Sequence, residues 1–241
     1  MQHPVVSREE WRAARAALIA KEKAFTRAGD ALGAEQRALP WVEIDKAYLF
    51  EGPAGRLTLA DLFDGRSQLF IKMFMLDPGQ TLQCTGCSLE VDHVAGLIEH
   101  LNGNDVSYAA VAPAPFAEIE VLRRRMDWRF PFVSCFGGDF ERDVDTVFAP
   151  EGVGTGNLVF YRDEAGRVFH TYSSYNRGCE AYLGIYRIFD VMPKGRGENG
   201  PYHTMGDWVR PRTLYGKGGT VERNGRYHPS VCGCDRHAEA S

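Results

Sequence analysis

Two cysteines separated by two residues, Cys84-Thr85-Gly86-Cys87, are the feature of this sequence best suited to chemistry. At the start of a helix this spacing brings two sulfurs within bonding reach, and the unsatisfied N–H groups and the helix dipole favour a thiolate on the first cysteine. We therefore expect Cys84, nearer the exposed end of the loop, to attack a disulfide or a peroxide, and Cys87 to resolve the intermediate. The pair is also half of a metal site, but no second pair follows at zinc-finger spacing.

A second group of possible ligands lies near the C-terminus and consists of His228, Cys232, Cys234 and His237. Two thiols and two imidazoles are the right number for tetrahedral zinc, so these residues are the candidate metal ligands, although we do not favour a metal cofactor. Two other interpretations stay open. The thiols are either exposed and without a role, or they form a dithiol that passes electrons to the first pair.

Cys135 and His170 are candidate auxiliary residues. Cys135 follows the strand-like run Phe-Pro-Phe-Val-Ser and could act as a third cysteine in a relay, but inert packing of a buried thiol is the favoured interpretation. His170 could pass a proton to a leaving thiolate, because an imidazole titrates near neutral pH. For His170 we favour a place in a buried aromatic network with Tyr172 and Tyr175.

The first cysteine pair lies between a predicted buried strand and a predicted helix. Residues 69–76 are apolar on both faces except for Lys72, which is typical of a central strand, and Asp77-Pro78-Gly79 ends the run. Apolar residues then recur at helical spacing over 87–101. The order strand, cysteine loop, helix favours redox chemistry over a purely structural pair.

The rest of the chain continues this alternation of strands and helices. Strands are predicted at 106–112, 130–134, 157–162 and 167–172, and helices at 8–27, 116–126 and 182–189. This order predicts an α/β fold with a mixed central sheet and helices on both faces, forming three layers. We divide the chain into an N-terminal helical extension (1–40), a central domain (41–194) and a glycine-rich, loop-rich C-terminal tail (195–241).

Composition excludes several other classes of protein. The 241 residues are 44% hydrophobic and carry a net charge of -4, so a core can form without disulfide staples and a general nucleic-acid surface is not expected. No apolar run approaches the ~20 residues of a membrane span, and charged residues interrupt the N-terminal stretch where a signal peptide would be apolar. We expect a cytoplasmic protein with reduced thiols and neither membrane nor nucleic-acid partners.

Several blocks of the sequence resemble one bacterial family. They include the run 69–75, the cysteine loop 84–88, the Met-Asp-Trp-Arg-Phe-Pro block within 124–134 and the His-Thr-Tyr-Ser-Ser-Tyr block at 170–175. Together, over residues 5–215, they resemble the bacterial thioredoxin-like proteins labelled domain of unknown function 899. The resemblance implies a thioredoxin fold of the peroxiredoxin-like branch for the central domain, with Cys84 and Cys87 in the active-site loop.

The function that these observations favour is a thiol–disulfide oxidoreductase acting on an unidentified disulfide or peroxide, with a redox-active disulfide and no other cofactor. Two alternatives stay open. One is a protein that handles copper or zinc through the same loop or the tail cluster. The other is a redox-silent binding module of the same fold. The N-terminal helix and the tail make a homodimer plausible, although neither shows a clean heptad repeat.

Overall fold

The computed structural model describes residues 3–144, 156–222, 225 and 227–228. The chain divides into two compact units, Met1–Trp41 and Val42–Ser241. Cys232, Cys234 and His237 of the predicted tail cluster lie outside the described residues.

The first unit is built around one long helix, α1 (Arg8–Arg37). It begins with a capping box, in which the Ser7 side chain accepts from the Glu10 N–H and the Glu10 carboxylate accepts from the Ser7 N–H. The helix runs ten residues past the predicted end at residue 27. Alanines recur throughout this stretch, and helix propensity carries the helix through Gly29 and Gly33.

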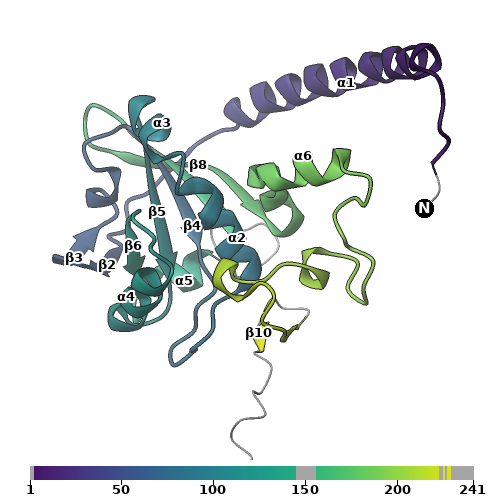
Figure 1. The fold of residues 1–241 in the computed structure, drawn as a ribbon. Helices are drawn as coiled ribbons and strands as arrows, with labels where there is room; N and C mark the ends of the chain where they lie inside the picture. The colour runs from purple at the N-terminus through teal and green to yellow at the C-terminus, as the bar shows by residue number, and fades with distance from the viewer. Residues whose placement is uncertain (1–2, 145–155, 223–224, 226, 229–241) are drawn as a thin grey trace, which may run out of the picture. The chain divides into compact units, whose positions relative to one another are not determined.

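The second unit is built on an eight-stranded mixed sheet with the order β1-β8-β7-β4-β5-β6-β2-β3 (Figure 1). The three strands β4, β5 and β6 run parallel, whereas β7 and β8 form an antiparallel hairpin beside β4. Short strands close both edges. The bounds are β1 (Val42–Glu43), β2 (Leu49–Gly52), β3 (Gly55–Thr58), β4 (Gln68–Met73), β5 (Val106–Ala112), β6 (Phe132–Ser134), β7 (Gly156–Arg162) and β8 (Val168–Tyr175).

Two helices connect the parallel strands. The helix α2 (Thr85–Val94) links β4 to β5, and α4 (Phe116–Arg125) links β5 to β6. The helix predicted over 87–101 is interrupted, because a separate helix, α3 (Ile98–Gly103), follows the turn that contains Gly96. The remaining elements are η1 (Asp61–Phe63), α5 (Phe140–Asp143), η3 (Asn176–Tyr182), α6 (Gly184–Val191), η4 (Met205–Asp207), η5 (Arg212–Leu214), β9 (Thr220–Val221) and β10 (Tyr227–His228).

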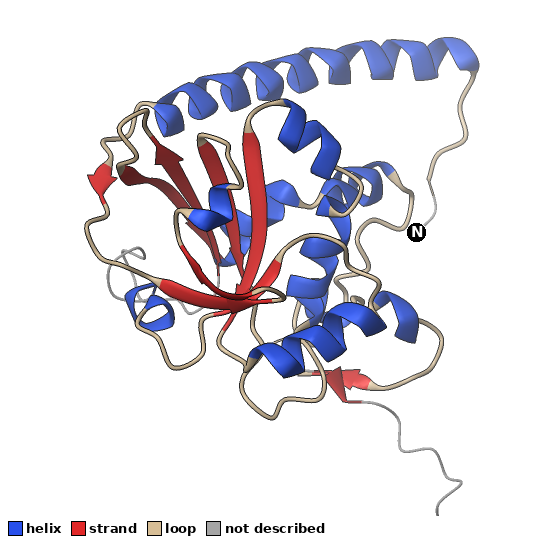
Figure 2. Ribbon diagram, turned by 90° about the vertical axis from the view of Figure 1, so that its left-hand side faces the viewer, coloured by secondary structure: helices blue, strands red, loops and turns tan. Residues whose placement is uncertain are grey.

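The sheet has a separate hydrophobic core on each face, since successive strand residues point to opposite sides. Residues of α2 and α4, such as Val91 and Ile119, pack with Tyr108 of β5 on one face. Residues of η1 and α5, such as Phe63 and Phe140, pack with Ile71 of β4 on the other. Figure 2 shows the strands as one twisted sheet between helical elements. The predicted three-layer α/β fold, with a mixed central sheet and helices on both faces, is confirmed.

The C-terminal part of the second unit is loop-rich, as predicted, but it is anchored. Val209, Val221 and Tyr227 are buried, although only short elements surround them. None of the helices in the described part of the chain combines the length and the apolar character that crossing a bilayer requires.

Candidate active site

The cysteine pair lies where the sequence predicts it, at the start of α2. Cys84 is the N-cap residue, and its Sγ accepts a hydrogen bond from the Cys87 N–H at 3.4 Å. The Ser88 hydroxyl donates to the Cys84 carbonyl at 2.8 Å. A sulfur at the N-cap takes the place of the usual capping oxygen, so the backbone donor at the start of this helix faces the thiol.

A buried ion pair lies beside the thiols. Lys72 Nζ on β4 lies 2.7 Å from Glu90 Oε2 on α2, and the two side chains are 3% and 6% exposed. Glu90 lies three residues after Cys87, on the same side of the helix. A lysine buried in an apolar strand is stable as a cation only when an opposite charge is close, and Glu90 provides that charge.

The two thiols are held in different protonation states. The hydrogen bond from the Cys84 thiol, together with the Lys72 ammonium and the Met75 N–H, lowers the pKa of Cys87 to about 6, against the effects of burial and of Glu90. The same thiol–thiol hydrogen bond and burial raise the pKa of Cys84. The shifts run opposite to the expectation that the first cysteine is the thiolate, because the thiol–thiol hydrogen bond favours the ionised form of Cys87 and the protonated form of Cys84.

The charges on this side of the sheet stabilise one another. Burial alone lowers the pKa of Lys72, but the negative charges of Cys87 and Glu90 raise it overall, so Lys72 stays protonated. Cys179, in η3, also lies within the field of Lys72, although burial raises the pKa of its thiol to about 11. Asn157 stands opposite Lys72 in the pairing of β4 with β7.

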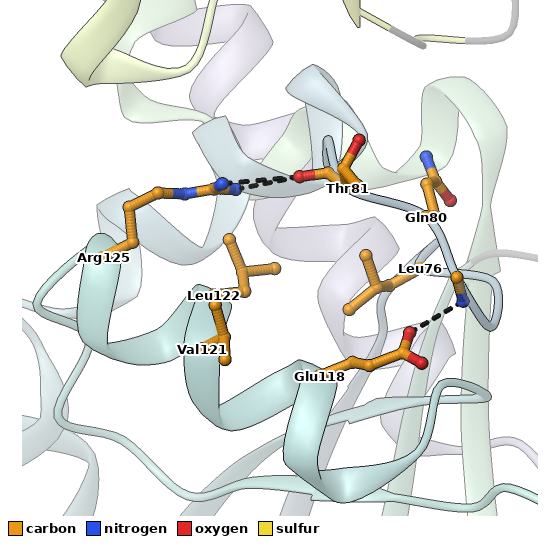
Figure 3. A pocket seen from close by; sticks show the side chains of 8 residues that line it. Leu76, Gln80, Thr81, Glu118, Val121, Leu122 and Arg125 are labelled. Carbon is orange, nitrogen blue, oxygen red and sulfur yellow. Dashed lines mark hydrogen bonds between the residues drawn. The ribbon is translucent and has the colours of Figure 1, made fainter.

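The loop that leads into Cys84 is held by α4 (Figure 3). The Arg125 guanidinium donates to the Thr81 carbonyl at 3.4 Å and to Gln83 Oε1 at 2.7 Å. The Glu118 carboxylate accepts the Gly79 N–H at 2.8 Å. These contacts border a pocket of about 320 Å³. They fix the backbone immediately before the cysteine pair.

A segment from the C-terminal part covers the cysteine pair. The C-terminal segment, by which we mean the described residues of 205–228, places the Gly225 carbonyl 3.1 Å from the Thr85 N–H. Its Met205 sulfur lies against Gly86, where an added Cβ would come within 2.9 Å. Cys84 is 7% exposed and Cys87 4% exposed, and both belong to the hydrophobic core on this face of the sheet. Cys84 keeps the larger exposed fraction, but both thiols are buried.

The two predicted auxiliary residues lie on the opposite face of the sheet from the thiols. Cys135 belongs to the core that contains Phe140, and burial raises the pKa of its thiol to about 12. The His170 ring packs against Phe160 of the same core, and its Nε2 lies 2.7 Å from Ser173 Oγ. Burial lowers the pKa of His170. The structure thus places both residues on the other side of the sheet from Cys84 and Cys87.

The predicted metal cluster is described only at His228. Its Nε2 lies 2.8 Å from Glu222 Oε1. Within the described residues, no group of three or more histidine, cysteine, aspartate or glutamate side chains is arranged to hold a metal ion.

Sequence reasoning missed the ion pair and the covering segment. Lys72 was visible as the single charged residue in an otherwise apolar run, and a lysine in that position requires a buried partner. Glu90 followed at helical spacing from Cys87. The contact of Gly225 with Cys84 left no signal, because it joins residues that are 141 positions apart in a loop-rich stretch.

Comparison with known proteins gives one family and several distant structures. The family model described as "Bacterial protein of unknown function (DUF899)" matches residues 1–215. No curated protein matches the chain. The chain is similar to a thiol:disulfide interchange protein from Bacteroides sp., with 12% identity and a TM-score of 0.42 over 64% of this chain and 93% of that one.

Two other solved structures show the same level of similarity. The uncharacterized thioredoxin-like protein from Porphyromonas gingivalis is 19% identical, with a TM-score of 0.41 over 62% of this chain and 92% of that one. Peroxidoxin BcpB from Mycobacterium tuberculosis is 13% identical, with a TM-score of 0.40 over 59% and 93%. Likenesses this distant say nothing about the reaction, which has to be inferred from the geometry of the site itself.

Proposed function

The chain belongs to the DUF899 family of bacterial proteins of unknown function, and from that premise we propose that it is a thiol–disulfide oxidoreductase with Cys84 and Cys87 as its redox centre. The observation that carries the proposal is the Lys72–Glu90 ion pair buried beside two neighbouring thiols. A cation placed there favours a thiolate, and a thiolate is the reacting form of cysteine. A pair of cysteines with only a packing role has no need of a buried charge.

In the proposed reaction Cys84 attacks the substrate and Cys87 resolves the intermediate. The shared proton moves from Cys84 to Cys87 as Cys84 Sγ forms a bond to one sulfur of a substrate disulfide, and the other sulfur leaves as a thiolate. The leaving thiolate takes up the proton from Cys87, and the Cys87 thiolate beside Lys72 then attacks Cys84 Sγ. The mixed disulfide breaks, the second substrate thiol is released, and a Cys84–Cys87 disulfide remains. The substrate gains two electrons and the protein loses two.

Lys72 and Glu90 act as positioning residues in this scheme. The ammonium lowers the energy of a thiolate on Cys87, both in the resting pair and when Cys87 must ionise for the second step. The Glu90 carboxylate keeps Lys72 charged and in place while it limits how far the thiolate is stabilised. Together they keep one thiolate available near neutral pH.

The test uses a small disulfide, hydroxyethyl disulfide, because both thiols are buried and a small substrate needs less access. With dithiothreitol as the electron source, we expect turnover by the full chain and a loss of at least about 100-fold in Cys84→Ser and in Cys87→Ser. Cys135→Ser, in which a cysteine outside the site is changed, should retain activity. A parallel assay with hydrogen peroxide distinguishes a disulfide substrate from a peroxide. Full activity of Cys84→Ser towards both substrates would refute the proposal.

A further inference from the structure

The helix α1 carries a row of exposed apolar side chains that repeats every seven residues. The apolar row, as we call it, consists of Trp11, Leu18, Phe25 and Leu32, which are 50%, 49%, 60% and 55% exposed. The helix predicted over 8–27 would contain only the first three, and the observed end at Arg37 adds Leu32. None of the described residues 8–37 is buried. Large apolar side chains aligned in this way mark a surface that binds a partner.

The spacing of the apolar row indicates what kind of surface covers it. A strict seven-residue repeat drifts only slowly around an α-helix of 3.6 residues per turn, and two helices that supercoil around each other keep it in contact. The second inward position of each repeat holds a small or polar residue, in the order Ala14, Lys21, Ala28 and Glu35. The repeat is therefore only half filled by large apolar residues. Small residues at the other positions let a second helix approach closely.

A second copy of α1 matches the apolar row in length. From Trp11 to Leu32 the row is about 32 Å long at 1.5 Å per residue. Within the described ranges of the second unit, the longest helices are α2 and α4, with ten residues each, or about 15 Å. Both already bury apolar residues in the core of that unit. A helix long enough to cover the row is therefore supplied by another chain.

An antiparallel arrangement brings the apolar rows of two copies together. With Phe25 opposite Phe25 of the second copy, each Leu18 lies opposite a Leu32, because both are seven residues from the centre. Gly29 then lies opposite Lys21. A Cβ added at Gly29 would meet nothing within 4 Å, so this position leaves room for the long lysine side chain of the other copy.

The charges beside the row favour the same arrangement. Arg15 and Glu35 are each ten residues from Phe25, so the antiparallel pair places Arg15 of one copy beside Glu35 of the other. Arg15 Nη2 already lies 2.8 Å from Glu22 Oε2, but its Nη1 has no hydrogen-bond partner among the described residues and can bind a second carboxylate. A parallel pair would instead place each of these charges next to the same charge of the second copy, and its helix dipoles would repel each other.

We propose that two copies of the chain associate through an antiparallel pair of α1 helices, in contact along the apolar row. The partner is thus a second copy of this chain, and the interface lies in the first compact unit. This inference goes beyond the proposed function and does not depend on it, because Cys84 and Cys87 belong to the other unit. Its failure would leave the redox proposal unchanged.

The first experiment measures the mass of the full chain by sedimentation equilibrium. We expect the mass to rise from 26.9 kDa towards twice that value as the protein concentration increases to about 200 μM. The variant Leu18→Lys/Phe25→Lys places two charges in the row and should require at least about 100-fold more protein for the same degree of association. A monomer at every concentration would overturn the inference, whether the row then packs on the same chain or binds lipid vesicles.

The matched control places the same two charges on the opposite side of the helix. Ala13 and Ala20 are exposed and lie about 200° around the helix from Trp11 and Leu18. Ala13→Lys/Ala20→Lys should therefore associate as the unchanged chain does. Equal weakening by the two double variants would contradict the role of the apolar row. Circular dichroism of both variants checks that the helix content is the same.

Disulfide trapping tests the orientation of the two helices. Chains with Leu18→Cys mixed with chains with Leu32→Cys should form a link between positions 18 and 32 under oxidised glutathione, and peptide mass mapping identifies it. Leu18→Cys chains alone should link to each other at least about tenfold more slowly, since the antiparallel pair leaves the two positions about 21 Å apart along the axis. A faster link between two positions 18, or no link between 18 and 32, would overturn the antiparallel pair.

Discussion

Two buried cysteines on opposite faces of the same sheet have pKa values that are shifted in opposite directions. Cys87 is 4% exposed and Cys135 is 2% exposed, so burial hardly distinguishes them. Nevertheless the pKa of Cys87 is lowered to about 6, whereas that of Cys135 is raised to about 12. On the Cys135 face burial and the Glu141 carboxylate both raise the pKa of the thiol. On the Cys87 face the neighbouring thiol and Lys72 outweigh burial.

Equal burial therefore does not give these two thiols equal pKa values, because the groups beside each thiol differ. Desolvation disfavours the thiolate on both faces. What differs is the neighbouring Cys84 thiol, whose hydrogen bond has the largest lowering effect on the pKa of Cys87, together with the Lys72 ammonium. On the proposed function, these neighbouring groups are what distinguish the redox pair from a packing cysteine.

The largest expected effect is on thiol reactivity. At pH 7 the thiolate fractions of Cys87 and Cys135 differ by about 10⁵, and the greater intrinsic nucleophilicity of the more basic thiol offsets part of this. We expect the cysteine pair to be alkylated by iodoacetamide at least about 100-fold faster than Cys135. Mass mapping of a time course measures the ratio. Equal alkylation rates at the cysteine pair and at Cys135 would contradict the difference between the two faces of the sheet.

The pH profile of the same alkylation sharpens the result. Because the pKa is lowered, the thiolate is present above about pH 6 and is lost as the pH falls through that value. The rate at the pair should therefore be half-maximal near pH 6 rather than near 8.5. This value belongs to the two thiols together.

The next largest effect is expected from changing the ion pair, and the two charges should act in opposite directions. Glu90→Gln removes a negative charge that raises the pKa of Cys87. The midpoint of the alkylation rate against pH should therefore fall below pH 6. The double variant Lys72→Met/Glu90→Gln removes the cation as well, and its midpoint should rise by at least about one unit. The measurement is alkylation against pH.

The double variant is preferred to Lys72→Met alone, because an unpaired buried Glu90 would destabilise the fold by about 3–5 kcal/mol. Glu120→Gln is the matched control, since Glu120 is paired with Arg123 and Arg124 on the outer side of α4. It should leave the midpoint unchanged. Shifts in the same direction for Glu90→Gln and the double variant would contradict the role given to Lys72.

The smallest effect is expected at Cys135. Cys135→Ala removes a sulfur from an apolar core and should lower the free energy of unfolding by about 1 kcal/mol. It should leave the redox midpoint of the Cys84–Cys87 pair unchanged, since the residues lie on different faces. Chemical denaturation and a redox titration measure the two quantities. A changed midpoint would show that Cys135 takes part in the relay after all.

The sequence was most informative where a pattern is local. The cysteine spacing, the apolar run and the turn residues predicted the strand, the loop and the helix that build the site, because each depends on neighbours along the chain. The break between α2 and α3 was missed, since apolar spacing continues through Gly96.

Contacts between distant positions were harder to predict. The partner of Lys72 depends on how α2 packs over β4, and the contact between Gly225 and Cys84 depends on where a loop-rich segment settles. Neither follows a period along the sequence. A lone charged residue in a buried strand was the one sequence signal that indicated a contact with a different element.

The most direct test of the central claim is a redox titration of the full chain against a dithiol buffer, with mass mapping of the paired cysteines at each potential. We expect a reversible Cys84–Cys87 disulfide with a midpoint potential between about -270 and -120 mV, the range of known thiol–disulfide enzymes. Cys135 should stay reduced throughout. If Cys84 and Cys87 never pair reversibly at any potential, the buried ion pair does not serve a redox centre and the protein is not a thiol–disulfide oxidoreductase of this kind.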